Sequence, residues 1–222
     1  KASIDAQKDF EVVWSVGLRG LTDSEYTACG NDLYRCARAI NEVVGNQTAW
    51  ILEKQKHRNV TMIFYLFGSA AQMMAMGLLH LPENVHVLAS DKYPYIGKVT
   101  RMDNETMGKC SGLYYHDAWY SLYTNDLTEM VPPSTAISEI SSFAARAKST
   151  THLVLNVANL LPTMMSTEAI MRFAFCPQDF EASAHAAQRR FLVSWSKREF
   201  TDGDAQLAEK AADLFEHYYD IV

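Results

Sequence analysis

The chain has 222 residues, 48% of them hydrophobic, so it can bury the core of one full-sized domain and is not expected to be disordered. Its formal net charge of -6 argues against general binding to nucleic acids or to anionic membranes. No run of about 18 apolar residues occurs, so no segment is expected to span a bilayer. These properties predict a globular protein with neither nucleic acid nor membrane among its partners.

Five short runs rich in β-branched and aromatic residues predict strands. They cover residues 12–16, 60–67, 85–89, 112–116 and 152–157. Helical spacing predicts helices between them, over residues 32–56 with a break near Gly45, over 70–79, and over 134–148 with Ser134 as N-cap. From residue 166 onward only helical patterns occur, over 166–175, 178–198 and 204–219, the last with Asp204 as N-cap.

Strand alternating with helix is the pattern of a parallel sheet built from β/α units. Such a sheet is either open and doubly wound or part of a (β/α)8 barrel, and a whole barrel needs about 250 residues. No Gly-x-Gly-x-x-Gly or Walker loop follows a strand, which disfavours a nucleotide-binding sheet. We expect residues 1–165 to form the β/α part and residues 166–222 a helical segment.

The four cysteines, Cys29, Cys36, Cys110 and Cys176, form no CxxC pair and lack the spacing of metal ligands. We therefore predict no metal and no other cofactor. Cys29 and Cys36 are seven residues apart, which is compatible with one helical face or with a local disulfide. Free, partly buried thiols are the simpler expectation.

Three Asn-x-Ser/Thr sequons begin at Asn46, Asn59 and Asn104, each in a polar stretch suited to a surface loop. They favour a secreted glycoprotein. The chain starts with Lys1 rather than Met, which is compatible with a mature chain, a fragment or a cropped domain.

Polar and aromatic side chains follow four of the five predicted strands. In chain order they are Arg19 and Asp23; Ser90, Asp91, Tyr93 and Tyr95; His116 and Asp117; Asn156 and Asn159. Only the second strand, which ends in Phe67-Gly68-Ser69, is bland. The carboxyl ends of parallel strands lie on one face, so we expect these side chains around one cleft. Aromatic rings and polar groups of this kind suit a sugar, and an Arg suits a carboxylate-bearing one.

Each of these residues also has a structural interpretation. Asp23 could cap a helix or pair with Arg19 on the surface, and Asp91 could form a turn. His116 could be a structural hydrogen-bonding residue. Tyr114 and Tyr115 point to opposite faces of their strand, so at most one of them faces the cleft.

Five segments resemble, in order and with similar spacing, segments of one enzyme family. They are residues 10–23 with Gly17-Leu18-Arg19-Gly20 and Asp23, residues 85–96, Ser-Gly-Leu-Tyr-Tyr-His at 111–116, Leu-Val-Leu-Asn-Val-Ala-Asn-Leu-Leu-Pro at 153–162, and Trp-Ser-Lys-Arg-Glu-Phe at 195–200. The family is glycoside hydrolase family 115, the xylan α-1,2-glucuronidases. The resemblance implies later β/α units of a (β/α)8 TIM-type barrel, with about five parallel strands, followed by a helical segment.

The resemblance also implies inverting release of (4-O-methyl)glucuronic acid α-1,2-linked to xylan, from glucuronoxylan or aldouronic acids. Inversion needs an acid and a base carboxyl about 6.5–9.5 Å apart. By position, Asp23 would be the acid, Asp91 the second catalytic carboxyl and Arg19 part of the uronic-acid pocket. The further substrate-binding candidates are Ser90, Tyr93, Tyr95, Tyr115, His116 and Asn156. The resemblance is also compatible with a homo-oligomer formed through domains outside this chain.

Several positions depart from the family pattern. Ser90 and Asp91 stand where the family has two consecutive acidic residues, and Asn159 and Leu161 replace Asp and Lys. Loss of a general base would slow turnover by roughly 10²–10⁴-fold. The alternatives are therefore a diverged relative that binds carbohydrate with little turnover, or a non-functional fragment.

Overall fold

The computed structural model describes residues 2–7, 9–20, 26, 28–56, 59–91, 102–117, 131–157, 161, 163–180 and 183–221. The chain forms two compact units. Unit 1 comprises Lys1–Ser90, Arg101–Tyr114 and Arg146–His152, and unit 2 comprises Asp91–Thr100, Tyr115–Ala145 and Leu153–Val222.

The strands among these described residues form a five-stranded sheet with the order β1-β2-β3-β4-β5. The strands are β1 (Val13–Ser15), β2 (Thr61–Leu66), β3 (Val85–Ser90), β4 (Gly112–His116) and β5 (His152–Asn156). The β1–β2, β2–β3 and β3–β4 pairs are parallel, with Val13 opposite Thr61 and Met62 opposite Val85. A doubly wound sheet reverses its strand order at a switch point, whereas consecutive neighbours are the order of a barrel. The predicted fold class, β/α units of a (β/α)8-type barrel followed by a helical segment, is confirmed.

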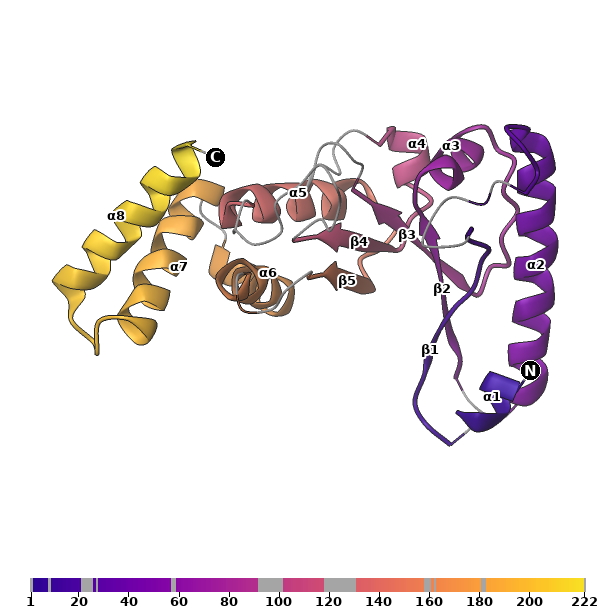
Figure 1. Ribbon diagram of the computed structural model, residues 1–222, viewed down its shortest axis with the longest axis horizontal. Helices are drawn as coiled ribbons and strands as arrows, with labels where there is room; N and C mark the ends of the chain where they lie inside the picture. The colour runs from indigo at the N-terminus through magenta and orange to yellow at the C-terminus, as the bar shows by residue number, and fades with distance from the viewer. Residues whose placement is uncertain are drawn as a thin grey trace. The chain divides into compact units, whose positions relative to one another are not determined.

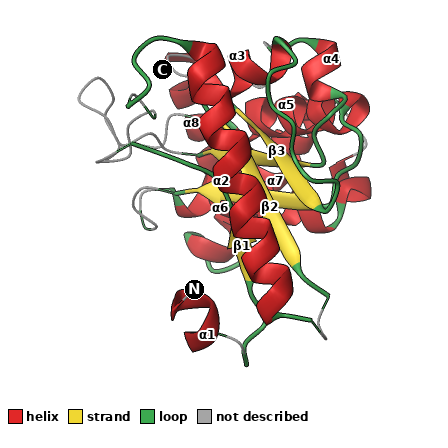
Figure 2. Ribbon diagram, turned by 90° about the vertical axis from the view of Figure 1, so that its right-hand side faces the viewer, coloured by secondary structure: helices red, strands yellow, loops and turns green. Residues whose placement is uncertain are grey.

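In unit 1 the main helix is α2 (Leu33–Lys54), which lies along the face of β1, β2 and β3 (Figures 1 and 2). It begins at the N-cap Asp32, whose Oδ1 accepts the N–H groups of Tyr34 and Arg35 at 3.0 and 3.1 Å. The predicted break near Gly45 is wrong. The helix runs through Gly45 because buried residues on both sides of it, among them Val44 and Thr48, anchor one continuous face.

The other helices of unit 1 are short: α1 (Ala2–Ala6), α3 (Ser69–Ala75) and α4 (Asn104–Met107). The predicted helix over 70–79 is shorter than expected, because Gly77 adopts a φ of 70° and turns the chain toward β3. Helix α4 was not predicted. Its N-cap Asp103 accepts the N–H of Thr106 at 2.8 Å.

Cys29 and Cys36 form a disulfide, so the prediction of free thiols at these positions is wrong. Cys36 lies in the first turn of α2, and Cys29 lies in the turn that leads into it, which brings their Cα atoms to 5.4 Å. Among the described residues, Cys110 and Cys176 are free. Burial raises the pKa of the Cys110 thiol to about 12, which keeps it unreactive.

We expect that replacing Cys29 and Cys36 together by Ala lowers the free energy of unfolding by about 2–3 kcal/mol, because the unfolded chain loses the constraint of a short closed loop. Urea unfolding of the oxidised protein measures this difference. Cys176→Ala is the matched control and should leave the midpoint unchanged. Equal midpoints for the wild type and the double variant would contradict the prediction.

Unit 2 is mainly helical. Its helices are α5 (Pro133–Arg146), whose last residue lies in unit 1, α6 (Met164–Phe175), a 3-10 turn (Pro177–Phe180), α7 (Ala184–Glu199) and α8 (Ala205–Ile221). Asp204 is confirmed as the N-cap of α8, since its Oδ1 accepts the N–H groups of Gln206 and Leu207. Ser134 is not an N-cap. The helix already begins at Pro133, a residue suited to a first turn, and the Ser134 N–H donates to Gln188 at 2.9 Å.

Helices α7 and α8 pack as an antiparallel pair over α6 around one apolar cluster (Figure 1). Its buried members are Met165, Ala169, Phe191, Leu192, Trp195 and Ala212. At the surface, Arg189 on α7 forms ion pairs with Glu209, Asp213 and Glu216 on α8. In the described ranges, no helix is both long and apolar enough to cross a membrane.

Candidate active site

The carboxyl end of β1 opens into a cavity of unit 1. The Val16 N–H makes the last sheet hydrogen bond, to the Ile63 carbonyl at 2.9 Å. Gly17 then takes a φ of 140°, and a Cβ at this position would lie 3.3 Å from the Phe64 ring. Glycine is therefore favoured at the point where the chain leaves the sheet. This turn carries Leu18 and Arg19 to the cavity.

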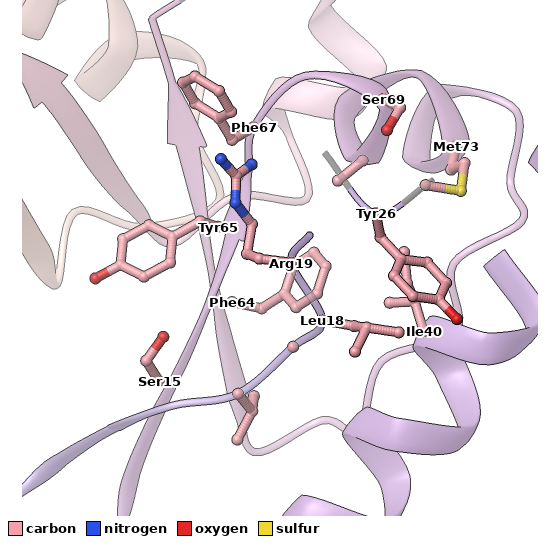
Figure 3. A pocket seen from close by; sticks show the side chains of 13 residues that line it. Ser15, Leu18, Arg19, Tyr26, Ile40, Phe64, Tyr65, Phe67, Ser69 and Met73 are labelled. Atoms are coloured by element: carbon pink, nitrogen blue, oxygen red, sulfur yellow. The ribbon is translucent and has the colours of Figure 1, made fainter. Parts of the chain in front are cut away.

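The cavity has a volume of about 250 Å³. This is close to the lower end of the roughly 300–1,000 Å³ found for ligand pockets, so it suits a group about the size of one sugar ring. Figure 3 shows the Arg19 side chain extending toward Phe67, with the Phe64 and Tyr26 rings beside Leu18. The walls are thus aromatic and aliphatic, with a guanidinium at one side.

Arg19 is held by its aromatic neighbour. Its guanidinium carbon lies 4.9 Å from the centre of the Phe67 ring, a cation–π distance. A guanidinium is the side-chain group best suited to bond a carboxylate through two parallel N–H groups. The description of the second strand end as bland was wrong, because Phe67 and Ser69 both line this cavity.

In unit 2, Asp91 and His116 form a buried pair. Asp91 is 1% exposed and His116 is 4% exposed. The His116 backbone N–H donates to Asp91 Oδ2 at 3.2 Å, and His116 Nδ1 lies 2.5 Å from Asp91 Oδ1. Both carboxylate oxygens of Asp91 therefore contact the same residue, one at its backbone and one at its ring. The pair fixes the orientation of the imidazole ring.

Asp117 follows His116 and joins the end of β4 to the first turn of α6. Its Oδ2 accepts the hydroxyls of Ser166 and Thr167, each at 2.8 Å, and its N–H donates to the Asn156 carbonyl at 3.0 Å. Asp117 is 3% exposed, and its Oδ1 has no hydrogen-bond partner among the described residues. Burial raises the pKa of this carboxyl to about 6, although the two hydroxyls act in the opposite direction.

The predicted site residues fall into four groups. Arg19 lines the cavity of unit 1, and Asp91 and His116 are paired in unit 2. Ser90 is buried at the end of β3, Asn156 is half-buried at the end of β5, and Tyr115 is fully buried in β4. Asp23, Tyr93 and Tyr95 lie outside the described residues.

The Tyr115 hydroxyl has no hydrogen-bond partner among the residues that the structure describes. Burial, with Asp91, Asp117 and Glu139 nearby, raises the pKa of Tyr115 well above its usual value. The side chain is therefore a neutral phenol at ordinary pH. Within the same described ranges, no three His, Cys, Asp or Glu side chains are grouped as metal ligands.

Sequence reasoning missed several residues around these groups. Phe67 carried a usable signal, because it lies at the carboxyl end of a predicted strand, as several of the other candidates do. Gln47, Ser166 and Thr167 carried none, because each lies within a helix and reaches its partner only through the tertiary fold.

Comparison with known proteins identifies the family of this chain. One solved structure is a family GH115 4-O-methyl-alpha-glucuronidase, BtGH115A, with specificity for decorated arabinogalactans. It superposes with a TM-score of 0.78 at 19% sequence identity, over 98% of this chain and 28% of that one. The chain thus spans just over a quarter of the length of that relative. No curated protein matches. The family model of glycosyl hydrolase family 115 matches residues 1–222, and the chain therefore belongs to this family.

Proposed function

We propose that the protein is a glycoside hydrolase that releases (4-O-methyl)glucuronic acid α-1,2-linked to xylan, with inversion at the anomeric carbon. Family membership supports the reaction class. The observation that carries the substrate class is the Arg19 cavity, where a guanidinium stacked on Phe67 faces space for about one sugar ring. A bidentate bond from this guanidinium would bind the uronic-acid carboxylate.

The proposed catalytic groups are those that the resemblance implies. Asp23 protonates the leaving oxygen, and Asp91 is the second carboxyl, which works through its pair with His116. The other proposed substrate-binding residues are Ser90, Tyr93, Tyr95, Tyr115 and Asn156. Tyr115 is fully buried, so its proposed effect on the substrate is indirect, through neighbouring groups. The sequons support secretion and glycosylation of the protein.

Release of uronic acid from aldouronic acids, and from a decorated arabinogalactan as the second substrate, tests this proposal. Arg19→Met should raise the KM by about tenfold or more, because a hydrogen-bonded charge partner of the carboxylate is lost. Arg38→Met, on the exposed face of α2, is the matched control for loss of one positive charge. Absence of release from both substrates by the wild type, or an unchanged KM in Arg19→Met, would refute the proposal.

A second candidate is a relative that binds the sugar with little turnover. The observation that favours it is the pairing of both Asp91 oxygens with His116, combined with the departures at Ser90, Asn159 and Leu161. Calorimetric titration with glucuronic acid and xylo-oligosaccharides separates the two. Binding without release supports this candidate, and no binding at millimolar ligand excludes it.

A further inference from the structure

The side chain of Gln47 pairs with both backbone groups of one residue at the end of β1. The Gly17 N–H donates to Gln47 Oε1 at 2.8 Å, and Gln47 Nε2 donates to the Gly17 carbonyl at 3.2 Å. Gln47 is half-buried on α2, thirty residues further along the chain.

Gly17 needs such a partner because the sheet ends one residue earlier. Val16 makes the last hydrogen bond to β2, and an unpaired peptide group in a partly buried position is costly. A carboxamide offers one acceptor and one donor at the spacing of a peptide, which a carboxylate or an alkyl side chain does not offer. The Phe64 ring also lies beside this residue, since a Cβ added at Gly17 would be 3.3 Å from it.

Gly17 is two residues before Arg19, and both line the cavity, whereas Gln47 is not among the described residues that line it. We propose that Gln47 is a positioning residue: it fixes the turn at Gly17 and so directs the Arg19 guanidinium at a carboxylate in the cavity. This inference rests on the proposed function, since it takes the uronic acid as the ligand of Arg19. Gln47 acts through the backbone and does not touch the ligand.

Helix α2 also provides a matched control. Asn41 makes the same two bonds to another loop: its Nδ2 donates to the Leu78 carbonyl, and its Oδ1 accepts the His80 N–H, both at 2.9 Å. Leu78 and His80 are not among the described residues that line the cavity. Loss of the Asn41 amide therefore removes a similar pair of hydrogen bonds from the same helix without altering the turn before Arg19.

The experiment measures the Kd of glucuronic acid and of glucose, its counterpart without the carboxylate, by calorimetric titration. The proteins are the wild type, Gln47→Glu, Gln47→Leu, Asn41→Leu and Arg19→Met. Thermal unfolding reports the stability of each variant. Hydrogen exchange of the Gly17 amide, followed by NMR, reports whether the hydrogen bond from Gly17 to Gln47 is present. We expect both Gln47 variants to reduce the preference for glucuronic acid by about tenfold, toward that of Arg19→Met. Asn41→Leu should keep the preference despite a similar loss of stability.

Each other result overturns the inference in a recognisable way. If the Gln47 variants expose the Gly17 amide to exchange but keep the preference for glucuronic acid over glucose, the Gln47–Gly17 hydrogen bonds do not position Arg19. If both Gln47 variants fail to fold, the amide serves folding rather than positioning. If the wild type itself shows no preference for the carboxylate, the proposed function fails and the inference falls with it.

Discussion

Replacement of Asp23 by Asn is expected to lower the kcat for release of uronic acid from aldouronic acids by at least about 10²-fold. In the proposed mechanism this carboxyl protonates the departing sugar oxygen, and general acid catalysis typically contributes roughly 10²–10⁴-fold. Asparagine keeps the size and polarity of the side chain but supplies no proton. The KM should change much less than the kcat, because the variant retains Arg19 as the proposed partner of the carboxylate.

The leaving group distinguishes an acid role from a general loss of structure. An aryl glucuronide with an acidic phenol as leaving group needs little protonation, so Asp23→Asn should retain most of its activity on that substrate. Asp9→Asn, at an exposed position of unit 1, serves as the matched control and should leave both rates unchanged. An equal loss of rate on both kinds of leaving group would show that Asp23 is not the acid.

The second large effect concerns stability at the buried carboxyl of Asp117. Its pKa is raised from 3.8 to about 6 in the folded protein, mainly by burial. Folding therefore takes up a proton between these two values, and the free energy of unfolding falls as the pH rises through them. Above pH 6 the buried Asp117 carboxyl is ionised in the folded protein. The free energy of unfolding is then about 3 kcal/mol lower than at acidic pH.

Asp117→Asn removes this titration. The amide oxygen can still accept the hydroxyls of Ser166 and Thr167, so the contact between β4 and α6 is retained. We expect the stability of the variant relative to the wild type to rise by about 3 kcal/mol between pH 3.5 and pH 7.5. Urea unfolding at a series of pH values measures this difference.

A hydroxyl variant checks the assignment to Asp117. Ser166→Ala removes a bond that favours the ionised form, so the folded-state pKa should rise further and the fall in stability should extend to a higher pH. Parallel pH curves for the wild type and Asp117→Asn would contradict the prediction.

Local sequence patterns were sufficient for the strands and for most of the helices. The β4 strand has the predicted bounds, and Asp204 caps α8 as its position before a helical pattern suggested. The errors occur where packing outweighs a local preference. Gly45 is a poor helix residue, but the buried face of α2 carries the helix through it. Ser134 is a good cap residue, but a proline at the preceding position already starts the helix.

The candidate site was predictable only in part. Arg19, Asp91 and His116 stand out in the sequence because each lies at or just after the carboxyl end of a predicted strand. Gln47 has no such mark: nothing in a helical pattern tells which backbone group, thirty residues away, its amide will meet. The same holds for Ser166 and Thr167, which reach Asp117 from a distance of about fifty residues.

The sequence by itself determined the alternation of strands and helices, the change to helices alone near residue 166, and the family. These properties follow from periodic burial and from short motifs, which are local. Only the tertiary structure decided that the strands are sequential neighbours, that Cys29 and Cys36 are joined, and that Gln47 holds the turn before Arg19. Such pairings depend on which groups are close in space, because a hydrogen bond or a disulfide forms only at contact distance.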